Sequence, residues 1–254
     1  MIRFNSTARS NPPALCTSEC PLRIPLVASD GLREEELESR WEAAPAVAVV
    51  IALQVLLAVA SRQQDWQLWI FSWWVWLVPV APEVLLLVPL AWQRRRRELE
   101  QQGRRRAVSI GLIGTVSAAN FVLLTAVIAS LIRGNETSGS QLLLKGIAVW
   151  TTNVIAFGLW FWEFDRGGPV SRLRQEPPLP DFLFPQLDDK ELAPRGWRPE
   201  LVDYLYVSYT NSIAFSPTDV MPLSRWAKLL MLAESSLSSI TVLLVAARAV
   251  NIFK

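Results

Sequence analysis

The side chains best suited to handling ions or protons in this chain lie mostly inside long apolar segments. Glu83 and Glu234 are carboxylates in blocks otherwise dominated by Leu, Val and Ala. A charged group within a bilayer is costly, so an intramembrane acid indicates a functional site by default. For Glu83, a structural acid hydrogen-bonded inside a helix bundle is the alternative interpretation, and the sequence leaves both open.

A second group of polar residues follows a short aromatic segment near the C-terminal end. All three tyrosines fall between positions 204 and 209, after Pro199-Glu200, which suits the start of a helix. A polar return and a membrane-length apolar helix come next, an order typical of a re-entrant pore loop. Non-helical backbone at membrane depth survives only where protein buries it or where it lines a water-filled cavity. The candidate pore-lining residues are Thr210, Asn211, Ser212, Ile213, Ala214, Phe215, Ser216, Thr218, Asp219, Glu234 and Ser238.

Several kinds of chemistry are disfavoured by composition. The chain has no histidine, which removes His-based catalytic triads, His metal ligands and His proton switches. Cys16 and Cys20 are the two cysteines, and without histidine their spacing is poor evidence for zinc, so we expect free thiols. No nucleophile–base pair or metal-ligand cluster is visible. We therefore expect no enzymatic activity, no bound metal and no cofactor.

The apolar residues fall in blocks of membrane length. Hydrophobic residues make up 51% of the 254 residues, and about 20 consecutive apolar residues span a bilayer core. We expect an all-α membrane protein with five transmembrane helices and a re-entrant pore-type half-helix between helices four and five. The five blocks are Ala44–Ala60, Trp66–Trp92, Ala107–Ile132, Gln141–Phe164 and Leu229–Phe253.

This pattern divides the chain into four parts. Residues 1–43 form a polar cytoplasmic tail with a short charged helix, and no signal peptide is expected there. Residues 44–168 hold the first four transmembrane helices. Residues 169–199 form a proline-rich cytoplasmic connector, and residues 200–254 hold the half-helix, the turn and the last transmembrane helix.

Basic residues predict the orientation in the membrane. A short loop after the second block carries Arg94, Arg95, Arg96, Arg97, Arg104, Arg105 and Arg106. With this loop inside, twenty Lys and Arg residues lie on the cytoplasmic side and five on the other. By the positive-inside rule, the N-terminus is expected inside and the C-terminus outside. Anionic-lipid contact is a possible addition for these arginines, and nucleic acid is not an expected partner.

Three features predict how the helices pack. Pro79, Pro82 and Pro89 should kink the second helix. The small residues of the third helix should let it approach a neighbour closely, and they are Gly111, Gly114, Ser117 and Ala118. Asn120 and Asn153, in the third and fourth blocks, are candidates for an interhelical hydrogen bond.

The C-terminal fifth of the chain resembles the pore module of potassium channels. The resemblance rests on the aromatic helix, on Asp219-Val220-Met221-Pro222-Leu223-Ser224, and on Arg225, Lys228 and Glu234 in the helix that follows. It implies an oligomeric pore-loop channel. The glycines of the potassium filter have no counterpart in residues 212–218, so the resemblance does not extend to potassium selectivity.

Most of the chain also resembles a family of uncharacterised bacterial five-helix integral membrane proteins. The shared features are the basic loop after helix two, Tyr206-Val207-Ser208-Tyr209-Thr210, Asp219 and the closing Ala249-Val250-Asn251. This resemblance implies a membrane location and no established activity.

We expect an oligomeric, cation-conducting ion channel of the cell membrane, with a tetramer favoured and the selectivity undetermined. The first alternative is a non-conducting scaffold or accessory subunit that retains the pore-loop shape. The second is a small transporter. A channel predicts loops that meet on a symmetry axis, and a scaffold predicts a dry loop buried in one subunit. A transporter predicts that Glu83 and Glu234 face a common cavity.

Overall fold

The protein is described from a computed structural model, which covers residues 43–64, 72–92, 104–133, 139–172, 178–189, 191, 196–216 and 219–252. The tail with Cys16 and Cys20, Arg94–Arg97 of the basic loop, and Thr218 lie outside the described residues. The elements are α1 (Ala43–Gln63), η2 (Trp73–Leu77), α2 (Val80–Ala91), α4 (Arg105–Arg133), α5 (Gly139–Phe164), η3 (Asp165–Gly167), α6 (Pro169–Arg172), β1 (Phe182–Leu183), α7 (Pro185–Asp188), α8 (Leu201–Ala214), β2 (Met221–Pro222) and α9 (Arg225–Ile252).

Among the described residues, five helical segments are long and apolar enough to cross a membrane, which confirms the expected number of spans by length and composition. The described chain is otherwise nearly free of strand, since β1 and β2 are two residues each. This pattern is that of a helical, multi-pass membrane protein. The spans are Ala43–Gln63, Trp73–Leu90, Arg105–Leu131, Gly139–Gly167 and Arg225–Ala247.

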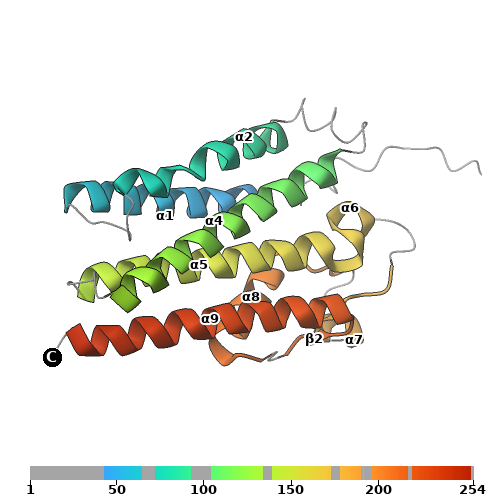
Figure 1. Cartoon of the computed structure of the whole chain (residues 1–254). Coiled ribbons are helices and arrows are strands. Elements are labelled where there is room, and N and C mark those ends of the chain that lie inside the picture. The colour runs from blue at the N-terminus through green and yellow to red at the C-terminus, as the bar shows by residue number, and fades with distance from the viewer. Residues whose placement is uncertain are drawn as a thin grey trace, which may run out of the picture. The chain divides into compact units, whose positions relative to one another are not determined.

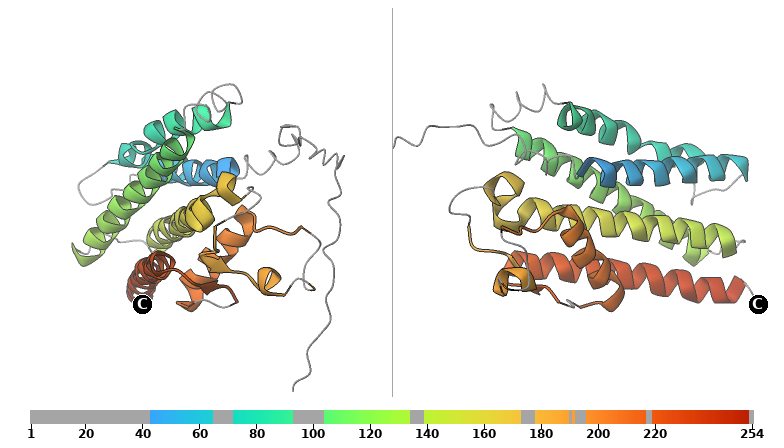
Figure 2. Two further views of the ribbon diagram at one scale, coloured as in Figure 1. Left: turned by 90° about the vertical axis from the view of Figure 1, so that its right-hand side faces the viewer. Right: turned by 180° about the vertical axis from the view of Figure 1, so that it is seen from behind.

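Helix α5 is the centre of the bundle. It packs against α1, α4, α8 and α9, and it is the most completely buried of the five spans. Figure 1 shows α5 between α4 and α9, with α6, α7 and β2 gathered at one end of the bundle and the C-terminus at the other. The two views of Figure 2 place α8 against α5 and α9, on the side away from α2.

Close helix approach occurs on α5. A Cβ added to Gly158 would lie 2.7 Å from Leu205 Cδ2 and 3.2 Å from Leu205 Cα, so α8 crosses α5 where no side chain intervenes. A Cβ on Gly146 would lie 2.8 Å from Val245 Cγ2 of α9. The prediction of close packing is wrong at Gly111 and Gly114, because no described neighbour lies within 4 Å of a Cβ built there. At Ser117 of the same stripe, α4 does contact α5, since Ser117 Oγ accepts a hydrogen bond from Trp160 Nε1 at 2.8 Å.

The second span is not one continuous α-helix. A 3-10 segment, η2, ends at Leu77, and α2 begins at Val80 with Pro79 as its N-cap. Proline lacks the backbone N–H that would continue the hydrogen-bond ladder, so the break falls at the first of the three prolines. Pro89 is accommodated inside α2.

The connector after α5 folds onto one end of the bundle. β1 pairs antiparallel with β2, so Phe182 lies opposite Pro222 just before α9 begins. Asp165, at the end of α5, accepts hydrogen bonds from Tyr204 Oη at 2.6 Å and from the backbone N–H of Asp181 at 2.8 Å. Asp181 in turn accepts from Trp226 Nε1 at 2.8 Å. These contacts tie α5, the connector, α8 and α9 together at a single end.

Candidate functional site

Helix α8 is positioned by a capping box at its start. Glu200 is the N-cap residue, and its backbone N–H donates to Asp203 Oδ2 at 2.7 Å. The helix then continues to Ala214, so it ends later than the polar residues 210–212 that the sequence suggests as its end. It ends at Phe215, whose backbone has a φ of 55° in the left-handed region. The chain changes direction at this residue.

The buried face of α8 carries polar groups at helical spacing. Tyr204, Ser208 and Asn211 are all buried, and residues three or four positions apart share one face of a helix. Tyr204 is held at the end of the bundle by Asp165. Ser208 and Asn211 lie deeper, against α5 and α9. Burial chiefly raises the pKa of Tyr204 above its ordinary value of 10, and the Arg172 guanidinium partly opposes that rise.

Glu234 of α9 is the centre of this polar cluster. Its side chain is fully buried and accepts a hydrogen bond from Asn211 Nδ2 at 2.7 Å. The second Asn211 amide hydrogen goes to Met231 O at 3.0 Å, and Ser235 Oγ donates to Asn211 Oδ1 at 3.0 Å. Ser208 Oγ contacts the other Glu234 oxygen, Oε1. Both carboxyl oxygens therefore have partners on α8.

The hydrogens around Ser208 can be counted. Its Oγ lies 2.7 Å from Val154 O of α5 and also contacts Glu234 Oε1. A serine hydroxyl carries one hydrogen, and a backbone carbonyl only accepts. The Ser208 hydroxyl thus links α8 to both α5 and α9.

A second chain of amides connects α4, α5 and α9. Asn120 Nδ2 lies 3.5 Å from Asn153 Oδ1, and Asn153 Nδ2 donates to Ser238 Oγ at 3.1 Å. The predicted Asn120–Asn153 contact is therefore confirmed, as a long hydrogen bond. Ser238 is one helical turn from Glu234, so the two polar groups lie on the same face of α9.

Glu83 of α2 occupies a comparable place on the other side of the bundle. It is fully buried and accepts a hydrogen bond from Gln54 Nε2 of α1 at 3.0 Å. Within the described residues, Glu83 Oε2 and Gln54 Oε1 have no hydrogen-bond partner. Sequence analysis did not identify Gln54 as a candidate, although it is the only polar side chain in the block Ala44–Ala60.

These polar side chains share a depth along the bundle. Every one lies within two residues of the midpoint of its own span, and together they come from all five spans. We refer to them as the mid-span layer. Its members are Gln54, Glu83, Asn120, Asn153, Glu234 and Ser238.

Other hydroxyls of α9 do not belong to this layer. Ser236, Ser239 and Thr241 each donate to the backbone carbonyl four residues earlier in the same helix. Such bonds use the hydroxyl hydrogen within the helix. The clustering of serines in the sequence is thus partly a feature of one helix.

The candidate lining residues separate into two groups. Four of them, Asn211, Ser212, Glu234 and Ser238, are buried within this single chain. Thr210 is half-buried, and its Oγ1 donates to Tyr206 O of its own helix at 2.9 Å. The exposed group forms the tip of α8 and the turn after it: Ile213, Ala214, Phe215, Ser216 and Asp219.

Sequence reasoning missed two acids, Asp165 and Asp181, that bond to α8 and to α9 respectively. Asp165 and Asp181 are in an exposed-looking, Gly- and Pro-rich region, and no local signal marks them. Their partners lie far along the chain, Tyr204 for Asp165 and Trp226 for Asp181. In the part of the chain that the structure describes, no group of three His, Cys, Asp or Glu side chains is placed to hold a metal ion.

In comparisons with protein-family models, with curated proteins and with solved structures, no match to this chain was found.

Proposed function

We propose that this protein is a multi-pass membrane protein in which α8 is a re-entrant half-helix, and that it assembles into a cation-conducting homo-oligomer. A tetramer is favoured by the resemblance of residues 204–247 to potassium-channel pore modules. Its role is permeation and not catalysis. The single observation that carries the proposal is the position of the turn after α8.

The turn comes shortly after a residue of α8 that contacts the middle of another span. Asn211 bonds to Glu234, which lies near the middle of its span, and the helix continues only to Ala214. With 14 residues, α8 is about 21 Å long, too short for a hydrocarbon core of about 30 Å. The chain then returns to β2, which pairs with β1 at the end where α8 began.

Backbone that leaves a helix at this depth needs partners other than lipid. Phe215 and Ser216 are exposed on this chain and are no longer helical. Lipid tails offer no hydrogen bonds, so such backbone is tolerated only against protein or water. A water-filled passage lined by the α8 tips of several copies meets this requirement, and Asp219 at the return would attract cations to it.

The outer face of α8 supports assembly with further copies. Tyr206 is 50% exposed and Tyr209 is 49% exposed, although α8 packs deep into the bundle. A tyrosine hydroxyl at membrane depth requires a hydrogen-bond partner, which lipid tails do not supply. The α8 face of a neighbouring copy is the partner that a symmetric ring would bring.

The proposed orientation follows from the basic residues. The turn between α2 and α4, the connector after α5 and the start of α9 would face the cytoplasm of a cell-membrane protein. The N-terminus would be inside and the C-terminus outside. Arg94–Arg97 and Arg104–Arg106 would then lie beside anionic headgroups.

Ion flux from liposomes tests conduction directly. The purified protein is reconstituted, and K⁺, Na⁺ and H⁺ fluxes are measured under an applied voltage. We expect a cation flux that Asp219→Asn reduces several-fold, because the return at the α8 tip loses its charge. Leu232→Ala, on the exposed face of α9, is the control and should leave the flux unchanged.

Thiol modification tests the position of the tip. In a background with Cys16→Ser and Cys20→Ser, Ser216→Cys should react with a membrane-impermeant thiol reagent added from the cytoplasmic side. Leu232→Cys, which the proposal places against lipid, should not react. A Ser216→Cys protein that is inert from both sides would remove the water-lined passage from consideration.

A non-conducting scaffold is the second candidate, and one observation favours it. Asn211 and Glu234 satisfy each other within one chain, as a dry packing motif would. A folded oligomer without flux, together with an unreactive Ser216→Cys, would support this function over the channel.

A further inference from the structure

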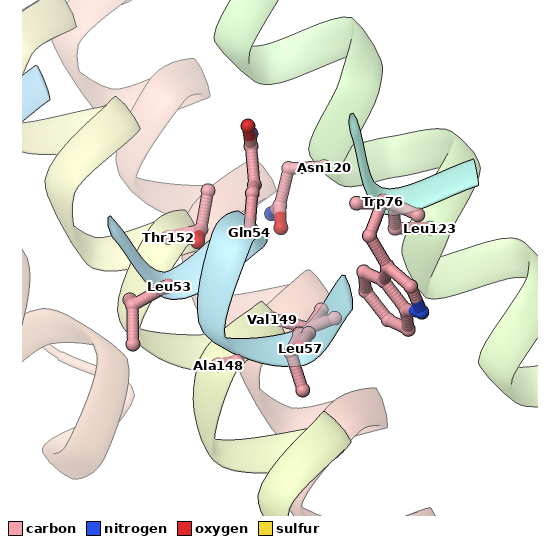
Figure 3. Close-up of a pocket in the computed structure, with 9 residues that line it drawn as sticks. All are labelled: Leu53, Gln54, Leu57, Trp76, Asn120, Leu123, Ala148, Val149 and Thr152. Carbon is pink, nitrogen blue, oxygen red and sulfur yellow. The ribbon is translucent and has the colours of Figure 1, made fainter. Parts of the chain in front are cut away.

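The first turn of α2 carries a buried carboxyl group whose one printed bond comes from a neutral donor. Glu83 is fully buried, and Gln54 Nε2 of α1 donates to its Oε1 at 3.0 Å. The second carboxyl oxygen, Oε2, accepts no hydrogen bond from any described residue. The Gln54 amide is neutral, so this bond brings no positive charge to the carboxyl group. Figure 3 shows that amide at the end of an extended side chain, pointing away from Leu57 and Val149.

The charged side chains on the elements around Glu83 lie at helix ends. Helix α2 packs against α1, α4 and η2, and η2 carries no charged residue. The charged residues of α1 and α4 are Arg62, Arg105, Arg106 and Arg133. At a rise of 1.5 Å per residue, Arg62 lies about 12 Å along α1 from Gln54, and the three arginines of α4 lie about 20 Å along that helix from Asn120. Within the described chain, Gln54 is the side chain that acts on the Glu83 carboxyl group.

Burial without a counter-ion determines the charge of such a group. An unpaired carboxylate is far more costly to remove from water than the neutral acid, so the acid keeps its proton. The start of α2 acts in the opposite direction, because a helix N-terminus favours a carboxylate by about tenfold or less. Burial of an unpaired ion disfavours the carboxylate by on the order of a thousandfold. The effect of burial is therefore the larger one.

We propose that Glu83 is a proton-binding site inside the membrane, and that it holds its proton at neutral pH. The proton lies on Oε2, since Oε1 already accepts a hydrogen bond from Gln54. The hydroxyl formed in this way is a donor, and Gln54 Oε1 is an acceptor that lacks a donor among the described residues. The site is separate from the proposed ion passage, because α8 lies on the side of the bundle away from α2.

The surroundings of Glu83 also make it a modification site for a lipid-soluble carbodiimide. The span that carries it is the least buried of the five, and Leu85 and Val88 of the same helix are exposed. A neutral carboxylic acid adds across a carbodiimide: its proton goes to one nitrogen, and its oxygen bonds to the central carbon. The acyl group then shifts to nitrogen and forms a stable N-acylurea. A carboxylate lacks the proton that the first step requires.

Infrared difference spectroscopy of the full-length protein in lipid nanodiscs measures the proton directly. The carbonyl stretch of a neutral carboxylic acid is resolved from the stretches of a carboxylate. We expect the spectrum of the unmodified protein at pH 7, minus that of Glu83→Gln, to contain the neutral-acid band. Glu191→Gln is the control, because Glu191 is an exposed acid, and its difference spectrum at the same pH should contain carboxylate bands instead.

Modification by dicyclohexylcarbodiimide provides a readout that does not require a variant to fold. Mass spectrometry of the unmodified protein, treated at pH 7, should locate several-fold more adduct on Glu83 than on Asp165. Asp165 is the matched acid, since it is also fully buried but has Arg166 Nε at 3.8 Å from its Oδ2. The inference is overturned if the difference spectrum for Glu83 contains only carboxylate bands, or if Glu83 carries no more adduct than Asp165.

Discussion

The two buried acids of the bundle occupy similar depths but differ in their surroundings. Glu234 has a partner on α8 for each of its two oxygens, and its neighbours Asn211 and Ser208 bond onward to α9 and α5. Glu83 has one partner, Gln54, and one oxygen without a partner among the described residues. Both oxygens of Glu234 therefore have partners, whereas Glu83 is only half-satisfied within the described chain.

The difference follows from the side chains that face each acid. Glu234 lies where α5, α8 and α9 come together, and Ser208 and Asn211 of α8 contact its two oxygens. Glu83 lies on the most exposed of the five spans, and within the described chain α1 alone supplies its hydrogen-bond partner. A short inserted helix such as α8 is therefore what completes the polar environment of an intramembrane acid here.

The largest loss of stability should come from a substitution at the point where α8 crosses α5. Gly158→Leu places a side chain where Leu205 Cα would already lie 3.2 Å from a Cβ, so α8 must move away from α5. We expect the free energy of unfolding to fall by about 3 kcal/mol or more. Gly111→Leu is the matched control on α4 and should be nearly neutral, since its Cβ meets no described neighbour within 4 Å. Thermal unfolding in nanodiscs measures both, and equal losses would contradict the role of Gly158.

Replacing the two acids compares the two environments directly. Glu234→Leu removes a hydrogen-bond partner from both Ser208 and Asn211, and we expect a loss of about 2–4 kcal/mol in unfolding free energy. Glu83→Leu removes a partner from Gln54 alone and should cost about half as much. Denaturation in mixed micelles measures the difference.

Glu234→Gln is the control for this comparison. Its amide places a hydrogen-bonding group at each of the two carboxyl oxygen positions, so most of the stability should remain. A Glu83→Leu protein less stable than Glu234→Leu would reverse the comparison between the two regions.

A smaller effect is expected at the end of the bundle. Tyr204→Phe removes the hydroxyl that donates to Asp165 at 2.6 Å, and Asp165 keeps its bond from the Asp181 backbone. We expect a loss of about 1–2 kcal/mol. Val202→Ala, at a position of the same helix that is 72% exposed, should change stability by less than about 0.5 kcal/mol. Equal effects from the two substitutions would mean that the Asp165 contact does not stabilise α8.

The smallest expected effect is a loss of stability at alkaline pH. Because burial raises the pKa of Tyr204 in the folded protein above 10, the unfolded chain loses this proton first as the pH rises. The contribution of Tyr204 is therefore complete below pH 10 and is lost progressively above it. Unfolding midpoints measured on either side of pH 10 should fall less steeply for Tyr204→Phe than for the unmodified protein. If the unfolding midpoints of the two proteins fell equally steeply above pH 10, this assignment would be contradicted.

Several elements were predictable because their causes are local in the chain. The five spans follow from apolar runs of membrane length, and the break before α2 follows from Pro79. The start of α8 was predictable from Pro199-Glu200, and Glu200 is its N-cap. The Asn120–Asn153 contact was predictable only because each amide stands in the middle of an apolar block.

The candidate pore-lining residues show what could not be predicted from local sequence. Asn211 and Ser216 look alike as small polar residues after an aromatic helix, yet Asn211 is buried against Glu234 and Ser216 is exposed. The side of a short helix that faces its neighbours depends on how it crosses them. That crossing is set at Gly158 of α5, which packs directly on Leu205 of α8. No local sequence pattern links these two positions, so the crossing could not be predicted.

The sequence by itself determined the helical class, the number and length of the apolar spans, the bias of the basic residues and the presence of two acids at mid-span. These properties depend on composition and on spacing within a few turns. Only the tertiary structure decided that Glu234 is satisfied by α8 and that Glu83 is half-satisfied by α1. It also decided that Asp165 holds Tyr204, and that Gln54 and Asn120 share a cavity. The physical reason is that each of these contacts joins residues on different helices, so it forms only once the helices have packed.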